Sequence, residues 1–267
     1  MPESNALLFQ QALPISQTRP IRVLGIDLGT TNCTAAEIRR DPSDVKNPVN
    51  PEFLDIPQPT LEGSEYSNTL LPSVLALHQG RIYIGEGAKR LRARCGEPES
   101  GLIPEKTIFW EEKNFIGVPR TLHKAPKGYR SASEIAGHIV GYIYETALEE
   151  DVRPPDKTVV TVPASFQVAQ RRDTLLACQL AGLNIEPGDL LDEPIAAFLH
   201  FLFSHSGTLH IGHPGQNLNC LIFDFGGGTC DTAIFRVRVP HAGESLEAAS
   251  LAVSRYHKLG GGDIDKA

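Results

Sequence analysis

Two glycine-containing turns each follow an apolar run that ends in an aspartate. Residues 221–235 read LIFDFGGGTCDTAIF, and residues 24–38 read LGIDLGTTNCTAAEI. Three glycines follow Asp224 and Phe225, whereas a solvated hairpin turn needs only one or two. One reading is an ordinary tight turn at the end of a buried strand. The reading that we favour is a loop whose backbone comes close to an anion or a metal.

The two stretches are related by one constant spacing. Asp224 lies 197 residues after Asp27, and the same spacing aligns three further pairs without a gap: Gly29 with Gly226, Cys33 with Cys230, and Ala36 with Ala233. We therefore expect an internal duplication, with two similar loops facing each other across a cleft. Each loop would offer backbone N–H groups and a carboxylate to a phosphate–metal complex. Threonine hydroxyls would add to these donors, namely those of Thr30, Thr31 and Thr229.

Composition excludes several other classes of protein. The chain has 267 residues, a formal net charge of −7 and 41% hydrophobic residues, which is ordinary for a soluble globular protein of one or two domains. The acidic balance argues against a nucleic-acid binder. Without a long apolar run or a secretory signal, we expect no membrane partner and a cytoplasmic location. The five cysteines indicate neither a zinc site nor a disulfide framework.

The elements that must position the loops follow from apolar spacing. Strands are expected at residues 21–26, 34–38, 73–77, 81–84 and 158–162, with an irregular insertion over 41–68. The pair Ser131 and Glu134 has the spacing of a capping box that opens a helix running to about Glu150. A second helix is expected from Ser165 as N-cap to Gly182 as C-cap, and a third over 193–203. This order predicts an α/β domain with a mixed sheet.

The duplication also divides the chain. We expect a flexible leader over residues 1–20, a first lobe over 21–220 and the start of a second lobe over 221–267. A duplication should give two halves of comparable length, but the second half here is short. We therefore expect this chain to be the N-terminal portion of a longer protein, or a trimmed version of one. A naturally minimal second half is the alternative. Cys33 and Cys230 suggest either a redox-sensitive site or simple packing residues.

Five ordered segments resemble the ATPase domain of the 70-kDa heat-shock chaperones, the DnaK-like family within the actin-like ATPase superfamily. They are GIDLGTTN at 25–32, VTVPASFQVAQRR at 160–172, LLDEPIAA at 190–197, FDFGGGTCD at 223–231 and LGGGDID at 259–265. The resemblance implies an actin-like, ribonuclease-H-like α/β fold, a mixed β-sheet flanked by helices, with a complete first lobe and a second lobe only begun. It also implies ATP or ADP in the cleft with Mg²⁺, and K⁺ as a further candidate ion.

The resemblance implies a role for each matching residue. Asp27, Asp224 and Glu193 would hold Mg²⁺ through water. Lys113, in WEEKNFIG, would position the γ-phosphate and the attacking water, and these four residues would form the catalytic set. Asp231 would help to bind a monovalent cation or orient water. The phosphate-binding residues would be Gly29, Thr30, Thr31 and Asn32 in one loop, and Gly226, Gly227, Gly228 and Thr229 in the other. The alternatives are a surface lysine on a helix for Lys113 and a helix-dipole partner for Glu193.

Further positions carry an implied switch or depart from the family pattern. Pro163 and Arg171 would relay nucleotide state to a substrate-binding domain, although a proline here can simply end a strand. The sequence departs from the family pattern at four positions. Ser165 stands where the family usually has an aromatic residue, and Ile195 stands where threonine is usual. Cys230 replaces the usual phenylalanine, and Gly262 replaces an acidic residue. The first three are expected to affect packing more than chemistry, and together they indicate a divergent member.

The function implied by the resemblance is ATP hydrolysis coupled to peptide binding in a stress-response chaperone. Its partners would be unfolded peptide clients, a J-domain co-chaperone and a nucleotide exchange factor. A small-molecule kinase, a polymerising scaffold protein and a degenerate nucleotide-binding regulator remain alternatives. Because the family's adenosine-contacting segments would lie after residue 267, we expect weak nucleotide affinity for this chain.

Overall fold

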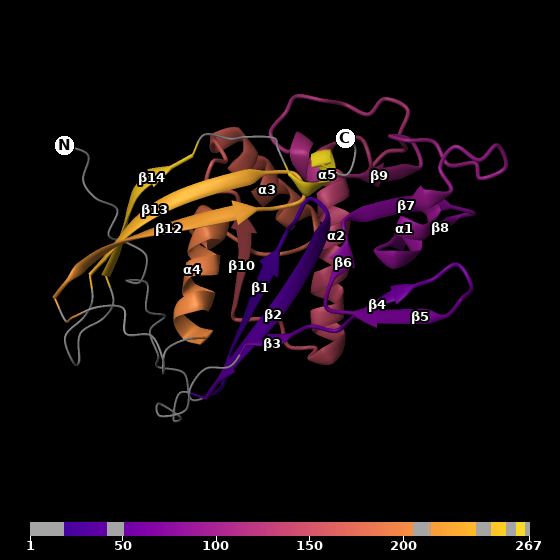
Figure 1. Ribbon diagram of the computed structural model, residues 1–267. Coiled ribbons are helices and arrows are strands. Elements are labelled where there is room, and N and C mark those ends of the chain that lie inside the picture. Colours follow the sequence, from indigo (N-terminus) through magenta and orange to yellow (C-terminus); the bar gives the residue numbers. More distant parts are fainter. Residues whose placement is uncertain are drawn as a thin grey trace.

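The computed structural model describes residues 19–41, 51–204, 213, 215–238, 247–254 and 260–264 (Figure 1). The expected leader over 1–20 therefore lies outside the described residues except for its last two positions. Two sheets form the frame, with the helix α4 (Glu193–Ser204) lying between them (Figure 1). The expectation of an α/β domain with a mixed sheet is confirmed.

The larger sheet has the strand order β11-β10-β1-β2-β3, with β6 paired to β2. Its members are β1 (Ile21–Asp27), β2 (Asn32–Arg40), β3 (Glu52–Phe53), β6 (Leu71–Pro72), β10 (Lys157–Val162) and β11 (Leu190–Asp192). β1 pairs in parallel with β10 and antiparallel with β2. Alternate residues of β1 are buried, with Leu24 and Ile26 at the centre of the main core.

Two long helices cover one side of this sheet. α2 (Ala132–Glu150) begins at the predicted capping box of Ser131 and Glu134, whose side chains and backbone bond reciprocally. It packs along α3 (Val168–Leu180), and a methyl group at Gly137 would come within 3.0 Å of the Ala177 carbonyl oxygen. Glycine therefore permits the close approach of the two helices.

No helix within the described ranges is long and apolar enough to cross a bilayer.

The ends of α3 differ in part from the prediction. Its N-cap is Gln167 and not Ser165, whose hydroxyl is engaged elsewhere. At the other end Ala181 is the C-cap, and Gly182 follows with a φ of 80°. The Gly182 N–H bonds the Gln179 carbonyl and the Leu183 N–H bonds the Cys178 carbonyl. This Schellman arrangement needs glycine at 182, which lies one residue beyond the observed C-cap Ala181 and was itself the predicted cap.

The segment between β3 and α2 forms a small peripheral layer. Its elements are β4 (Ile56–Pro59), β5 (Glu65–Asn68), β7 (Val74–His78), β8 (Arg81–Ile84), α1 (Glu86–Ala93), β9 (Ile108–Trp110) and the 3₁₀ helix η1 (Glu112–Phe115). The predicted hairpin of β7 and β8 is confirmed. The prediction of an irregular insertion is wrong over residues 51–68, because β4 and β5 pair there. Buried Gln58 fixes this hairpin by bonding the Leu70 carbonyl and the Glu86 N–H.

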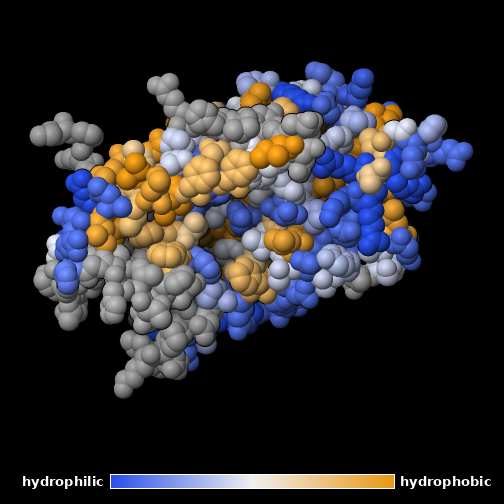
Figure 2. All heavy atoms as spheres, viewed as in Figure 1, coloured by the Kyte–Doolittle hydropathy of each residue, from blue (hydrophilic) through white to orange (hydrophobic). Residues whose placement is uncertain are grey.

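The second sheet consists of β12 (Asn217–Phe225), β13 (Cys230–Arg238) and β14 (Glu247–Val253). Phe198 of α4 stacks on Phe235 of β13, so one face of this sheet is packed. The expectation of a buried strand before Asp224 is wrong, because Leu221 and Phe223 are each 65% exposed. Figure 2 shows the hydrophobic side chains gathered over this sheet. β12 also begins four residues before the predicted lobe boundary at 221. A 3₁₀ turn, η2 (Pro187–Asp189), and the short α5 (Gly261–Ile264) complete the described elements.

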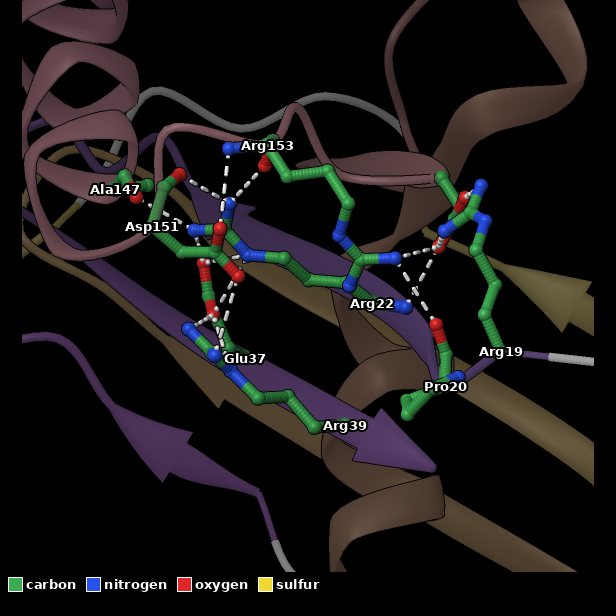
Figure 3. A network of polar contacts seen from close by, with 9 residues as sticks. Arg19, Pro20, Arg22, Glu37, Arg39, Ala147, Asp151 and Arg153 are labelled. Atoms are coloured by element: carbon green, nitrogen blue, oxygen red, sulfur yellow. Dashed lines mark hydrogen bonds and ion pairs between the residues drawn. The ribbon is translucent and has the colours of Figure 1, made fainter. Parts of the chain in front are cut away.

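A buried arginine ties β1 and β2 to the end of α2 (Figure 3). The Arg22 side chain is fully buried, and its Nε donates to both carboxylate oxygens of Glu37 at 2.9 and 3.0 Å. Its Nη atoms donate to the Ala147 carbonyl at 2.5 Å and the Asp151 carbonyl at 2.8 Å. The last turn of α2 carries no basic residue of its own. Arg22 therefore supplies the positive charge that a helix C-terminus favours.

Candidate functional site

The two glycine turns are built on hairpins of identical register. In the first hairpin Asp27 is paired with Thr34, and in the second Asp224 is paired with Asp231. Both partners are related by the same spacing of 197 residues that the sequence predicts. The register thus confirms two copies of one strand–loop–strand unit, each with an aspartate at the end of its first strand.

The two loops face each other but lie in direct contact, whereas the sequence predicts a cleft between them. A methyl group at Gly227 would stand 1.9 Å from Thr31 Oγ1, and one at Gly228 would stand 2.8 Å from Thr30 Oγ1. The second loop is closed by the Gly226 N–H, which donates to the Thr229 carbonyl at 2.9 Å. Glycine is required at 227 and 228 because any side chain would displace the facing loop.

A cleft of about 630 Å³ opens beside the two loops. The proposed catalytic residues line it together: Asp27, Lys113, Glu193 and Asp224. So do most of the loop residues, namely Gly29, Thr30, Thr31, Asn32, Gly226, Gly227 and Thr229. The carboxylates come from the ends of β1 and β12 and from the first turn of α4, and the lysine comes from η1. Gly228 and Asp231 are not among the lining residues.

Lys113 is paired with Glu193 inside this cleft. Its Nζ lies 2.5 Å from Glu193 Oε1, and the two side chains are 7% and 14% exposed. The reading of Lys113 as a surface lysine is therefore wrong. Burial opposes the charged ammonium, but the Glu193 and Asp27 carboxylates more than offset this and raise the pKa of Lys113. Burial raises the pKa of Glu193 to about 7, with Asp27 and Asp224 adding to the rise and Lys113 opposing it.

Thr161 of β10 is a site residue that the sequence reasoning missed. Its hydroxyl donates to Asp27 Oδ1 at 2.5 Å, which fixes the carboxylate at the edge of the cleft. The parallel pairing of β10 with β1 brings the two residues together although 134 positions separate them. The available signal was a threonine near the carboxyl end of β10, because the carboxyl ends of parallel strands lie at the same edge of a sheet.

The two cysteines near the loops differ in burial. Cys33 lies in β2 and is fully buried, with its sulfur 3.2 Å from the Ser73 hydroxyl. Burial raises the pKa of this thiol to about 11, which keeps the thiol protonated and favours the packing role for Cys33. Cys230 opens β13 and is half-buried.

Asp231 and Ser165 form a buried contact next to Asp224. Ser165 Oγ donates to Asp231 Oδ1 at 2.5 Å, and the residues are 4% and 1% exposed. The other Asp231 oxygen is buried and has no hydrogen-bond partner among the described residues. Ser165 therefore makes a polar contact with a proposed site residue in addition to packing in the interior, and its expected effect on packing more than chemistry stays a prediction. Burial, and next the charge of Asp231, raise the pKa of Asp224.

The two residues of the proposed switch lie in the β10–α3 connection and in the first turns of α3. Pro163 is buried directly after β10, and its carbonyl accepts the Phe166 N–H at 3.0 Å. Arg171 bonds the Phe166 carbonyl at 3.1 Å and Asp192 Oδ1 at 2.5 Å. Asp192 immediately precedes Glu193. The segment from 163 to 171 is therefore connected to the last residue of β11, directly before Glu193 opens α4.

The two remaining departures lie in the second sheet and its neighbours. Ile195 packs against the core between α4 and the second sheet, as expected for a packing residue. Gly262 belongs to α5, whose first N–H, that of Gly261, donates to the Gly226 carbonyl at 3.0 Å. This bond seats the segment around 260–264 on the second glycine loop.

The donor set fits a hydrated divalent cation. Among the residues that the structure describes, no three His, Cys, Asp or Glu side chains are placed to ligate one ion directly. Asp27, Asp224 and Glu193 nevertheless line the same cleft. Mg²⁺ retains several waters and is bound by few carboxylates together with phosphate oxygens, so water-mediated contacts from these residues suit it.

A two-copy hairpin frame with acidic strand ends beside facing loops is the arrangement of an actin-like ATPase fold. The family model described as "Hsp70 protein" matches residues 23–267, and the chain belongs to the Hsp70 family. It is 32% identical over 243 residues to the chaperone protein DnaK of Metamycoplasma hominis, covering 91% of this chain and 34% of that protein. It is 31% identical over 267 residues to DnaK of Thermus thermophilus, covering 92% and 37%. It is 30% identical over 274 residues to the chaperone protein HscA homolog of Acinetobacter baumannii, covering 97% and 39%. The chain thus spans 34% to 39% of the length of these relatives.

Proposed function

We propose that this chain is the phosphate-binding part of a chaperone ATPase, and that the intact protein binds ATP or ADP with Mg²⁺ and hydrolyses ATP. The observation that carries the proposal is the convergence of Lys113, Glu193, Asp27 and Asp224 beside two facing glycine loops. Membership of the Hsp70 family supports the same chemistry. Hydrolysis of a phosphoanhydride depends mainly on positioning and charge neutralisation, and this cleft provides both.

Each group has a distinct task in this proposal. The backbone N–H groups and hydroxyls of the two loops bind the terminal phosphates. Asp27, held by Thr161, acts with Asp224 and Glu193 on the water shell of Mg²⁺, which supplies positive charge to the phosphate oxygens. Lys113 stays protonated beside Glu193 and binds a γ-phosphate oxygen. Glu193, whose pKa is raised to about 7, orients the attacking water and accepts its proton when ionised.

A monovalent cation such as K⁺ fits next to Asp224. Asp224 and Asp231 are direct partners across β12 and β13, and like charges in that position repel. One Asp231 oxygen is also buried without a partner among the described residues. A cation bound there would relieve both conditions.

The intact protein would couple this site to peptide binding. The relatives are chaperones, which supports unfolded peptide clients, a J-domain co-chaperone and a nucleotide exchange factor as partners, with neither nucleic acid nor membrane. Pro163 and Arg171 would carry the signal, and the hydrogen bond from Arg171 to Asp192 offers a physical route to Glu193. A cytoplasmic location is part of the same proposal.

The test is ATP hydrolysis by the intact protein under single-turnover conditions. Asp224→Asn should reduce the rate by about 100-fold, since it removes charge at the proposed metal site. Asp55→Asn, at an exposed aspartate, should leave the rate unchanged. Equal rates in the wild type and Asp224→Asn would contradict the proposal. Tight ATP binding without any hydrolysis would favour the regulator alternative.

A further inference from the structure

Ser165 and Asp231 are brought together from separate parts of the fold. Ser165 lies in the turn between β10 and α3, and Asp231 lies in β13 of the second sheet. Their contact is an O–H···O bond of 2.5 Å in which both residues are almost completely buried. Because Ser165 does not cap α3, its hydroxyl is available for this bond.

The contact satisfies only one of the two oxygens of the Asp231 carboxylate. Oδ1 is occupied by the serine, and Oδ2 is buried with no partner within the described part of the chain. Asp224 stands directly opposite in the strand register, and Asp231 helps to raise its pKa. A buried, unpaired carboxylate oxygen beside a second carboxylate requires a water or a positive ion.

We propose that Ser165 is a positioning residue that holds Asp231 so that its free oxygen, together with Asp224, binds a monovalent cation. This proposal rests on the proposed function, because the cation would sit beside the phosphate cleft. The serine hydroxyl fixes the rotation of the carboxylate about its Cβ–Cγ bond. It also satisfies the oxygen that the cation does not use. Without the hydroxyl, the carboxylate turns and both oxygens compete for one ion.

The test measures how K⁺ stabilises the purified protein. The thermal unfolding midpoint is followed as KCl replaces choline chloride at constant ionic strength, with NaCl as a second series. Four variants are compared with the wild type: Ser165→Ala, Ser165→Thr, Asp231→Asn and Ser133→Ala. Ser133 is a matched control because it is also a buried serine, 5% exposed, but lies in α2. MgADP binding by the wild type is measured separately.

The expected result is a specific shift in the K⁺ requirement. The K⁺ concentration that gives half of the stabilisation should rise about tenfold in Ser165→Ala, which is the size expected for a hydrogen bond to a charged group. Ser165→Thr keeps the hydroxyl and should stay close to the wild type, as should Ser133→Ala. Asp231→Asn should lose the K⁺-specific effect, while a purely structural role for Ser165 would lower every midpoint without changing the K⁺ requirement.

Two results would overturn the inference. One is an unchanged K⁺ requirement in Ser165→Ala, and the other is a wild-type protein that responds alike to K⁺ and choline. Neither result bears on the proposed function if the wild type binds MgADP. Failure of the proposed function would appear separately, as absence of MgADP binding. If Ser165→Ala does not fold, Ser165→Cys takes its place, because its thiol is a weaker donor and should also raise the K⁺ requirement, and an unchanged requirement in Ser165→Cys would overturn the inference.

Discussion

The Lys113 ammonium and the Glu193 carboxylate lie 2.5 Å apart although 80 positions separate them in the sequence. One comes from η1 in the peripheral layer and the other from the first turn of α4. A buried ion pair contributes little net stability, because removing both charges from water costs about as much as their attraction returns. Its place in one cleft with Asp27 and Asp224 is instead what a phosphate site requires.

Replacing Lys113 should separate catalysis from binding. We expect Lys113→Met to slow single-turnover ATP hydrolysis by about 100- to 1,000-fold, since one positioned charge near the transferred phosphate is lost. Nucleotide affinity should change less, because the loops and the metal still bind the phosphates. Lys89→Met is the control, since the Lys89 side chain is 62% exposed. A loss of less than threefold in Lys113→Met would show that the lysine does not act in the reaction.

Glu193 should make stability fall as the pH rises. Its pKa is raised from 4.5 to about 7 in the folded protein, so the folded state binds one more proton than the unfolded state between these values. The unfolding free energy contributed by this group therefore decreases from pH 4.5 to 7 and is constant above. Glu193→Gln lacks this contribution, so its stability relative to the wild type should increase by about 3 kcal/mol from pH 4.5 to 8. Urea unfolding of both proteins at four pH values measures this change. A difference in unfolding free energy between wild type and Glu193→Gln that does not vary with pH would refute the raised pKa of Glu193.

Gly227 should tolerate no side chain. In Gly227→Ala the new methyl group would meet Thr31 Oγ1 at 1.9 Å, so the two loops must separate. We expect saturable MgADP binding to be lost while the far-ultraviolet circular dichroism is retained. Gly188→Ala is the matched control, because nothing lies within 4 Å of its added methyl group and its φ is not positive. Unchanged binding in Gly227→Ala would mean that the facing loops do not hold the phosphates.

Arg22 should be critical for stability and not for chemistry. Arg22→Met leaves Glu37 buried without its main cation, which should lower the unfolding free energy by about 3–5 kcal/mol. The double variant Arg22→Met/Glu37→Met should recover part of this loss, because it leaves no buried charge behind. Arg39→Met, at a side chain that is 46% exposed, should cost no more than about 1 kcal/mol. Hydrogen exchange should also quicken at the end of α2 in Arg22→Met, and a loss below 1 kcal/mol would contradict this account.

Local signals predicted the elements that frame the site. The capping box at Ser131 and Glu134, the glycine after α3 and the alternating pattern of β7 and β8 all depend on neighbouring residues, and the structure has them. The duplicated hairpin was also predictable, because a constant spacing in sequence became a constant register in space.

The sequence could not reveal contacts that only the tertiary fold creates. Thr161 meets Asp27 because β10 pairs with β1, and Ser165 meets Asp231 because the second sheet packs beside the β10–α3 turn. The helix-cap reading of Ser165 failed for the same reason, since a distant carboxylate competes for its hydroxyl. Arg22 lies in an apolar strand pattern that gives no sign of its partners on α2.

Equilibrium binding of MgADP to the protein, with magnesium pyrophosphate as competitor, shows whether this cleft binds nucleotide phosphates. We expect saturable binding at one site, weakened by Asp224→Asn, with pyrophosphate competing because the loops contact phosphates. Weak affinity is expected for this chain, so the titration must reach about 1 mM ligand. Absence of saturable binding at that concentration, or binding that pyrophosphate leaves untouched, would contradict the assignment of this cleft as a nucleotide-phosphate site.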